Sequence, residues 1–403
     1  MDESVKFANI KAREEQLLCR SYSRYPLAIV RGAMSRLYDV DGKEYVDLLA
    51  GIAVTALGHC NPEVCAALNE GAQKLWHVSN LFYQEEQLDL AEILLSTTHH
   101  DKAFFCNSGA EANEAAIKLA RRYMCKVRQR DAYEIITLSG CFHGRTLGTL
   151  AATSRETLSA GFEPLPAGFV NVERGNISAL DKAINDKTAA VMLEVVQGEG
   201  GVIPLPGDYL RAVEKLCRER DILFICDEVQ AGFCRTGTFW AFQQHQLKPD
   251  IMTTAKALAN GLAMGCMMTT DEVALGFEAG SHATTFGGGA LASKVATKVV
   301  EIMLRDKLAE RAGLVGQNLR IKLDKLLAKY PNKIKEIRGL GLIVGIELKQ
   351  NCPQVWRELI KRGFICSLSH NTTLRLLPAL NISEEDLGNF CQTLDDILAD
   401  ANF

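Results

Sequence analysis

The chain has 403 residues, of which 47% are hydrophobic and 23% charged, and its formal net charge is −4 at pH 7. This balance argues against a disordered chain and against a basic surface for nucleic acid. The length predicts two or three domains, and no internal repeat or long polar linker is visible. Thirteen cysteines show no close C-x-x-C pair or metal-ligand spacing. We therefore expect reduced, mostly buried thiols and a cytoplasmic protein.

The sequence offers no segment for a membrane or an export pathway. The first residues, MDESVKFANIKAREEQ, lack an apolar signal core, and their acidic residues argue against a transit peptide. Residues 250–271 are small and apolar but contain too many polar side chains to cross a bilayer. We expect neither a membrane nor a nucleic acid among the partners.

From about residue 100, short apolar runs alternate with helical segments. Strands are expected at 103–106, 134–138, 188–196 and 222–226, with helices over 111–124 and 208–221. Continuous apolar strands separated by helices predict an α/β fold, in which a mostly parallel sheet is covered on both faces. Ligands of such sheets bind beyond the carboxyl ends of the strands.

The pattern changes after about residue 290. Two long helical segments run from Ala292 to about Tyr330, and strand-like runs follow at 340–348, 363–368 and 373–377. RGLGLIVG is not a dinucleotide fingerprint, because its third glycine is one residue late and a strand follows. These features predict a smaller α+β domain at 291–403, joined by an N-terminal segment at 1–50, beside a large domain at 51–290.

The last helix has its own start signal. Ser383 and Asp386 stand three residues apart before an apolar-periodic run, which predicts a capping box.

The first candidate site residues lie in CNSGAEANEAA, where a predicted strand ends and a helix begins. The backbone N–H groups of Ser108, Gly109 and Ala110 would point outward at the positive end of this helix, an arrangement that binds phosphate. The alternative is an ordinary helix start with Asn107 or Ser108 as the N-cap.

A second candidate, Asp227, ends the apolar strand in ICDEVQAG. A carboxylate at this place is costly unless a cation meets it. Either a neighbouring helix supplies the cation in a salt bridge, or the carboxylate holds the protonated ring nitrogen of a cofactor.

The third candidate, Lys256, is the only charged residue between Asp250 and Asp271. A desolvated lysine without a partner tends to lose its proton, and a neutral amine forms Schiff bases with carbonyl groups. The alternatives are a surface lysine or one paired with a carboxylate distant in sequence. Together, an imine-forming lysine, an aspartate for a pyridinium and a phosphate loop meet the polar demands of pyridoxal 5'-phosphate (PLP).

At these residues the chain resembles a known family. GIAVTALGHCNPEV, NSGAEANEAAIKLAR, CFHGRTLGTLAAT, CDEVQAGFCRTG, TTAKALANG, SHATTFGGGALA and LRLLPAL match, in order and spacing, the class III aminotransferases of PLP fold type I. Within that family the chain is most similar to the acetylornithine aminotransferases. The resemblance implies a large domain with a mostly parallel seven-stranded sheet between helices, plus a smaller α+β domain.

The resemblance also implies roles for the residues that match. Lys256 matches the Schiff-base lysine, and Asp227 matches the partner of the pyridinium nitrogen. The other cofactor positions are the phosphate loop at Ser108, Gly109 and Ala110, the two ring faces at Phe142 and Val229, and the ring hydroxyl at Gln230.

Four further matches concern the substrates and a second subunit. Arg145 and Arg375 match two arginines that bind substrate carboxylates, and Glu199 matches an acid that pairs with the second arginine. Guanidinium groups suit carboxylates because both are planar and bidentate. Thr285 matches a threonine that reaches the phosphate of the neighbouring subunit, which implies a homodimer with shared sites.

The activity implied is transfer of an amine from N2-acetyl-L-ornithine to 2-oxoglutarate in arginine biosynthesis, with N-succinyl-diaminopimelate as a plausible second donor. Ornithine, succinylornithine and 4-aminobutyrate remain alternative donors. Ornithine enzymes tend to carry an aromatic residue where this chain has Ile52. A non-catalytic PLP-fold binding protein and an isomerase of the glutamate-semialdehyde type are the alternatives from other classes.

The chain departs from the family pattern at a few positions: Val195 and Val196 where a proline is common, Cys234 in place of glycine, and Phe286 and Gly289 in place of Tyr and Asn. We expect these changes to alter loop rigidity and cofactor affinity without removing the chemistry.

Three histidines lie inside the matching motifs: His59, His143 and His282. No spacing supports a metal site, so we expect them to act as hydrogen-bonding residues.

Overall fold

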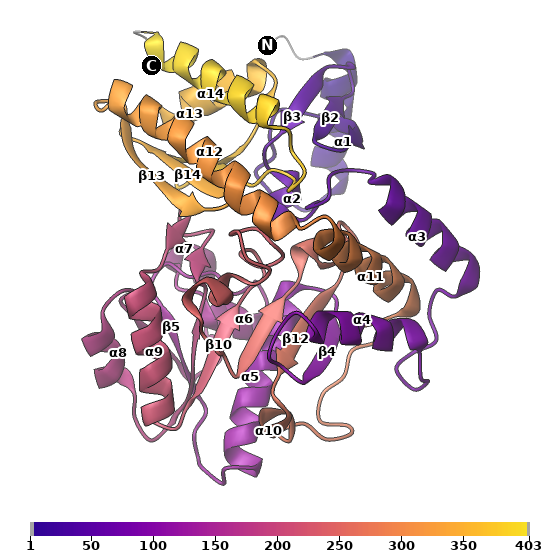
Figure 1. The fold of residues 1–403 in the computed structure, drawn as a ribbon, viewed down its shortest axis with the longest axis vertical. Helices are drawn as coiled ribbons and strands as arrows, with labels where there is room; N and C mark the ends of the chain where they lie inside the picture. The colour runs from indigo at the N-terminus through magenta and orange to yellow at the C-terminus, as the bar shows by residue number, and fades with distance from the viewer. Residues whose placement is uncertain (1–3, 401–403) are drawn as a thin grey trace.

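The computed structural model describes residues 4–400, so the outer ends of the predicted 1–50 and 291–403 ranges lie outside the described part. A seven-stranded sheet forms the centre of the lower region in Figure 1. Its spatial order is β4 (Lys102–Cys106), β12 (Gly265–Thr269), β11 (Ile251–Thr254), β10 (Leu223–Asp227), β7 (Thr188–Leu193), β5 (Glu134–Leu138) and β6 (Phe169–Val172). β12 is antiparallel to both neighbours and the other pairs are parallel, which confirms the predicted sheet.

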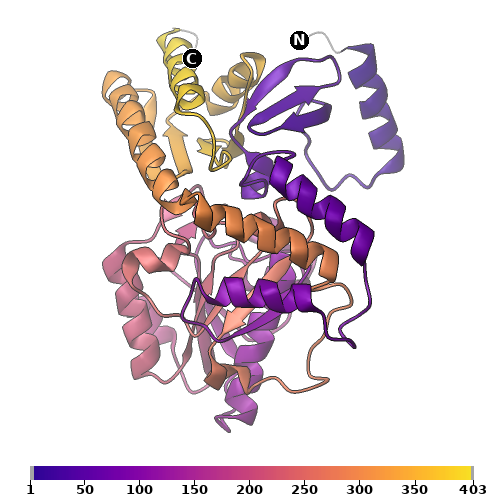
Figure 2. The ribbon, with the colours of Figure 1, turned by 45° about the vertical axis from the view of Figure 1, so that its right-hand side comes forward.

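Helices cover both faces of this sheet. The helices of this region are α3 (Pro62–Lys74), α4 (Glu85–Leu95), α5 (Gly109–Lys126), α6 (Leu147–Ala152), α7 (Glu156–Ser159), α8 (Ile177–Ala183), α9 (Gly207–Glu219), α10 (Asp271–Ala274) and α11 (Ala290–Arg305), with the 3₁₀ turns η1 (Ala241–His245) and η2 (Lys256–Ala259). Along β10, Ile225 packs in the cluster under α5, while Phe224 and Cys226 pack in the opposite cluster. The alternation of a strand thus fills two apolar layers, so the whole run is apolar. Figure 2 shows α3, α4 and α11 packed together beside the sheet.

The predicted strand at 188–196 is too long. β7 ends at Leu193, and the buried carboxylate of Glu194 accepts hydrogen bonds from the N–H of Phe142 at 3.0 Å and of Gly198 at 3.4 Å. These bonds turn the chain away from the sheet. A short hairpin of β8 (Val196–Gln197) and β9 (Ile203–Pro204) follows.

The upper region of Figure 1 contains two four-stranded sheets. One joins β1 (Ile29–Ala33), β2 (Arg36–Asp39) and β3 (Glu44–Asp47) to β15 (Phe364–Ile365), and the other has the order β13 (Ile334–Leu340), β14 (Ile343–Leu348), β17 (Thr373–Leu376) and β16 (Ser367–Ser369). The helices of the upper region are α1 (Val5–Leu17), α2 (Ala50–Ala53), α12 (Leu308–Lys329), α13 (Cys352–Lys361) and α14 (Glu384–Ala399). Because β3 pairs with β15, the N-terminal strands at 29–47 share a sheet with the C-terminal part.

Two predicted strands of the C-terminal part divide in the structure. The 340–348 run contains a turn at Gly341 with a φ of 53°, where a Cβ would lie 2.6 Å from the carbonyl oxygen of Arg235. Only glycine fits this turn, which separates β13 from β14. The 363–368 run changes sheet at Cys366, because β15 pairs with β3 and β16 pairs with β17.

The predicted capping box is half correct. Ser383 caps α14 and accepts a hydrogen bond from the N–H of Asp386 at 3.0 Å. The Asp386 carboxylate does not return to the cap, because it binds Arg36 at 2.6 and 2.9 Å.

We propose the domain division 1–50, 51–290 and 291–403 on the basis of these sheets. No helix within residues 4–400 has the length and apolar content to span a bilayer.

Candidate active site

Lys256 lies where β11 ends and η2 begins, at the carboxyl edge of the central sheet. Its backbone φ is 38°, a left-handed value that is uncommon outside glycine. Among residues 4–400, no carboxylate oxygen lies within ion-pair distance of its amine. Burial lowers the pKa of Lys256, the nearby Arg375 lowers it further, and Glu199 and Asp227 oppose both effects. The lowered pKa makes this amine easier to deprotonate than that of a surface or ion-paired lysine, which suits a nucleophile.

Asp227 ends β10, the strand next to β11, and is almost fully buried. One carboxylate oxygen accepts hydrogen bonds from His143 Nδ1 and Asn113 Nδ2, each at 2.8 Å, and the other accepts the N–H of Val229 at 3.0 Å. Asn113 is fixed in turn by Thr253, whose hydroxyl donates to its Oδ1 at 2.6 Å. No neighbouring helix supplies a salt bridge to Asp227 within residues 4–400, and three bonds leave the carboxylate room for one more donor.

His143 is the ionisable partner of Asp227 and is fully buried. Burial opposes its charged form, but Cys141 and Asp227 raise the pKa of His143 above its usual value. Sequence reasoning assigned His143 a hydrogen-bonding role but did not find its partner. Asn113 was missed, although a polar side chain on the buried face of a helix is a signal that could have found it.

The start of α5 lies at the same edge of the sheet. Ser108 is its N-cap and accepts the N–H of Glu111 at 3.2 Å, while the Glu111 carboxylate turns back to the N–H of Asn107 at 2.5 Å. The first-turn N–H groups of Gly109 and Ala110 have no intrahelical acceptor by position. A Cβ on Gly109 would lie 2.8 Å from Val229, so the loop after Asp227 and the start of α5 are in close contact.

Phe142 and Arg145 lie on the loop between β5 and α6. The N–H of Phe142 is held by Glu194, and the guanidinium of the exposed Arg145 lies 5.7 Å from the centre of the Phe142 ring. Burial raises the pKa of Glu194 to about 7. The loop thus places an aromatic ring beside an exposed cation.

Arg375 on β17 reaches the large region from the small one. Its Nη1 contacts Glu199 Oε1 at 2.6 Å and Gln230 Oε1 at 3.4 Å, and Gln230 Nε2 donates to Glu199 at 3.3 Å. Burial raises the pKa of Glu199, but Arg375 and Lys256 outweigh it and lower this pKa to about 2. The structure therefore brings Gln230 to the arginine–glutamate pair, a contact that the sequence did not predict.

Thr285 is the predicted site residue that the chain does not bring to the others. It is exposed on the loop before α11, whereas its neighbour Thr284 accepts a hydrogen bond from Asn107 Nδ2 at 3.1 Å. The remaining predicted residues all lie at one edge of the sheet or on the small-region strand that faces it.

Two other histidines have the hydrogen bonds expected of them. His59 Nε2 contacts Asp47 at 2.7 Å, and His282 Nδ1 contacts Lys118 Nζ at 2.7 Å. Within residues 4–400, no group of three or more histidine, cysteine, aspartate or glutamate side chains is placed to hold a metal ion.

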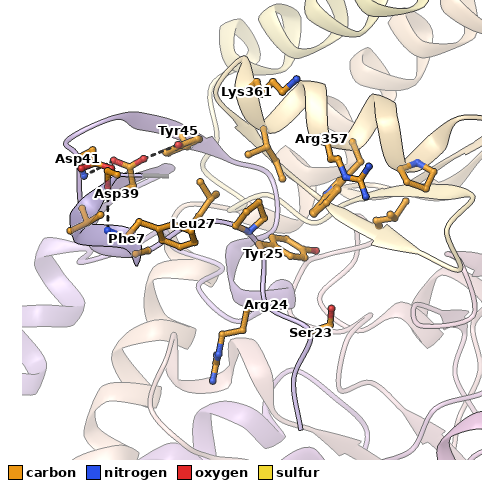
Figure 3. Close-up of a pocket in the computed structure, with 18 of the residues that line it drawn as sticks. Phe7, Ser23, Arg24, Tyr25, Leu27, Asp39, Asp41, Tyr45, Arg357 and Lys361 are labelled. Carbon is orange, nitrogen blue, oxygen red and sulfur yellow. Dashed lines mark hydrogen bonds between the residues drawn. The ribbon is translucent and has the colours of Figure 1, made fainter. Parts of the chain in front are cut away.

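A separate cavity of about 770 Å³ lies between the N-terminal segment and α13 (Figure 3). Its described lining includes Tyr25, Tyr45 and Arg357, and it also reaches Asn371 on the turn between β16 and β17. Tyr25 packs edge-on against Trp356, with ring centres 4.8 Å apart. Neither Lys256 nor Asp227 lines this cavity, so it is distinct from the site at the sheet edge.

The residues at the sheet edge fit PLP. An imine-forming amine, a buried carboxylate with a free acceptor position and a helix start suited to phosphate match its aldehyde, its ring nitrogen and its phosphate. The fold and site together define a PLP-dependent enzyme.

Comparisons with known proteins identify the family. The family described as Aminotransferase class-III matches residues 18–398. The acetylornithine aminotransferase of Methanocaldococcus jannaschii is 44% identical over 96% of this chain and 97% of its own, and that of Caldanaerobacter subterraneus is 42% identical over 97% and 99%. A structure of Toxoplasma gondii ornithine aminotransferase with partial occupancy of PLP superposes with a TM-score of 0.94, at 30% identity over 98% of this chain and 95% of that one. The chain belongs to the class-III aminotransferase family and is a PLP-dependent transaminase.

The Glu199–Arg375 pair predicts an acid-dependent loss of stability. The folded-state pKa of Glu199 is about 2 against an ordinary 4.5, so the pair stabilises the fold fully above about pH 4.5 and progressively less as the pH falls toward 2. Glu199→Gln lacks this contribution. We expect the difference in free energy of unfolding between the two proteins to shrink on acidification in urea titrations. A difference that stays constant would show that the pair does not titrate in this way.

Proposed function

We propose that this transaminase uses N2-acetyl-L-ornithine as its amino donor. It would transfer the distal amine to 2-oxoglutarate, giving N-acetyl-L-glutamate 5-semialdehyde and L-glutamate, a step of arginine biosynthesis. The observation that carries the proposal is the Glu199–Arg375 contact of 2.6 Å beside Lys256, because one arginine can then serve two substrates of different charge. The 44% identity to the Methanocaldococcus jannaschii enzyme supports the same donor. N-succinyl-diaminopimelate is a second donor in the proposal.

Each side chain then has a defined task. PLP supplies the carbonyl group that takes up the amine and a ring that withdraws electrons. Lys256 would hold the cofactor and, as a general base, would carry a proton to and from the substrate carbon. Asp227, fixed by His143 and Asn113, would keep a proton on the ring nitrogen.

The two arginines divide the recognition of substrates. Arg145, exposed on the loop before α6, would bind the α-carboxylate of the acylated donor and the distal carboxylate of glutamate. Arg375 would bind only the α-carboxylate of glutamate or 2-oxoglutarate, after Glu199 has released it. During the donor half-reaction the closed pair keeps Arg375 neutralised.

Ile52 favours an acylated donor over free ornithine. It is 41% exposed on α2, which packs against η2, the turn that begins with Lys256. An apolar side chain there offers no hydrogen bond to a free α-amine, whereas the acetyl group of the donor can pack against it.

A comparison of kcat/KM among several amino donors tests this proposal. We expect kcat/KM for N2-acetylornithine to exceed that for ornithine by at least about tenfold, because an unpaired ammonium next to apolar surface costs more than ~1.4 kcal/mol. Steady-state kinetics with acetylornithine, ornithine, succinylornithine and 4-aminobutyrate at fixed 2-oxoglutarate give the comparison. Preference for ornithine would refute the donor assignment, and turnover of a donor without 2-oxoglutarate would indicate an isomerase. A pure protein that binds PLP but transfers no amine would support the non-catalytic alternative.

We propose a homodimer in which Thr285 completes the site of the other subunit. The segment between α3 and α4 exposes Trp76, Leu81 and Phe82 at 69, 87 and 66%. The same segment contacts the Thr285 loop, where the rings of His77 and Phe286 lie 5.3 Å apart. Exposed apolar surface on this scale is typical of an interface.

Leu81→Asp is expected to convert the dimer into monomers and to lower the activity at least about tenfold, because a buried interface charge costs several kcal/mol. Light scattering after size-exclusion chromatography gives the mass, and cofactor titration gives the site occupancy. Leu314→Asp, on an exposed face of α12, is the matched control and should remain dimeric. Dimers that persist in Leu81→Asp would place the interface elsewhere.

A cytoplasmic location belongs to the same proposal. All thirteen cysteines are free thiols and nine of them are buried, which suits a reducing compartment.

A further inference from the structure

The loop that carries Glu199 is bound by three side chains of the small region. Arg375 Nη1 donates to the carbonyl of Gly198 at 3.1 Å, His370 Nε2 donates to that of Glu199 at 3.0 Å, and Arg338 Nε donates to that of Gly201 at 2.9 Å. Three donors thus bind three carbonyl groups between residues 198 and 201. These bonds hold the loop backbone and leave the Glu199 carboxylate available to pair with Arg375.

Close packing supports the same picture of the loop. Gly201 has a φ of 102°, and a Cβ there would lie 3.2 Å from Arg338 Nη2. On the other strand, a Cβ at Gly345 would lie 3.1 Å from the carbonyl oxygen of Gly201. The loop therefore packs tightly against β13 and β14, so that a side chain at either glycine would displace its neighbours.

His370 reaches the loop from a strained turn. His370 and Asn371, between β16 and β17, have φ values of 51° and 57°, which cost free energy in residues other than glycine. The same hairpin carries Arg375 on β17. The turn thus fixes the position of the His370 ring relative to Arg375. His370 binds the backbone of Glu199, and Arg375 binds its carboxylate.

We propose that His370 and Arg338 are positioning residues that hold the backbone of Glu199 while its carboxylate leaves and rejoins Arg375. The inference rests on the proposed function, in which Arg375 binds the α-carboxylate of glutamate or 2-oxoglutarate only after Glu199 has moved. A fixed backbone keeps the Glu199 carboxylate 2.6 Å from Arg375 Nη1 and so strengthens the ion pair. The α-carboxylate of glutamate or 2-oxoglutarate must compete with Glu199 for Arg375. His370 and Arg338 thereby set the preference between dicarboxylate substrates and the acylated donor.

His370→Ala should loosen the pair and make Arg375 easier to reach. We expect the KM for 2-oxoglutarate to fall about two- to tenfold, the range of one net hydrogen bond. The kcat/KM for the acylated donor, measured in the single-turnover half-reaction, should change less than about twofold. Asn371→Ala is the matched control, because it places alanine in the same left-handed turn without removing the donor to Glu199.

A double-mutant cycle separates positioning from a general effect on structure. In a Glu199→Ala background there is no pair to hold, so His370→Ala should leave the KM for 2-oxoglutarate unchanged. His370→Gln keeps an N–H donor and should restore the wild-type value. Arg338→Lys keeps a charge for Glu347 but loses the Nε–H donor, and it should lower the KM in the same direction as His370→Ala.

Binding of glutarate, an unreactive dicarboxylate, to the holoenzyme gives a readout that does not depend on turnover. Calorimetry should show tighter glutarate binding to His370→Ala than to the wild type. An equal shift in Asn371→Ala, a shift that persists with Glu199→Ala, or unchanged glutarate affinity would overturn the inference. The proposed donor fails separately, in the wild-type donor panel, and glutarate binding can still be measured if it does.

Discussion

Lys256→Ala is expected to lower transamination by about 10⁴-fold, the upper end of the range for loss of a positioned general base. The variant also loses the amine proposed to bind the cofactor aldehyde, so the visible absorbance of lysine-linked PLP should disappear. Activity with the acylated donor and 2-oxoglutarate at saturating PLP, together with absorbance before and after borohydride, provides the measurement.

Two variants make that result specific. Lys256→Arg keeps a positive charge but cannot become a neutral nucleophile, and it should be as inactive as alanine. Lys248→Ala removes an exposed lysine outside the site and should leave activity and absorbance intact. An active Lys256→Arg enzyme would mean that Lys256 acts only through its charge, and the proposed chemistry would be wrong.

Asp227→Asn is expected to lower kcat by about 10² to 10³-fold, the range for losing one preorganised electrostatic contact. The amide keeps the size of the side chain but removes the negative charge that would hold a proton on the ring nitrogen. His143 would also lose the carboxylate that raises its pKa. Lysine-linked absorbance should still form at high PLP, so binding and chemistry can be separated by titration and single-turnover kinetics.

Asp250→Asn is the matched control for Asp227→Asn. Asp250 is a largely desolvated carboxylate that accepts the N–H of Phe224 at 2.8 Å, but it precedes β11, at the opposite end of the sheet from Asp227. The Asp250→Asn variant should have a changed melting temperature and an unchanged kcat. A similar loss of kcat in both variants would attribute the effect to the fold and remove Asp227 from the chemistry.

Local sequence patterns predicted the fold well because their causes are local. The strands at Lys102–Cys106 and Glu134–Leu138 and the helix that begins after Ser108 depend on apolar runs and a cap, which neighbouring residues determine. The strand at 188–196 was predicted too long because its end depends on Glu194, whose partner Phe142 lies 52 residues away.

The site shows the same division. Lys256, Asp227 and the start of α5 could be proposed from sequence, because a charge in an apolar run and a polar strand end are visible without a partner. Their roles, with those of Arg145 and Thr285, remain predictions. The contacts of Asp227 with Asn113 and His143 join residues 114 and 84 positions apart, and no local pattern encodes them.

The sequence by itself determined the order of strands and helices, the buried strand ends that carry polar groups, and the family to which the chain belongs. Only the tertiary structure decided which further donors bind the site acceptors: His143 and Asn113 for Asp227, Gln230 for the Glu199 carboxylate, and His370 for the Glu199 backbone carbonyl. The physical reason is that periodicity and capping act over a few residues. A buried polar atom must instead find a partner wherever the packed chain places one.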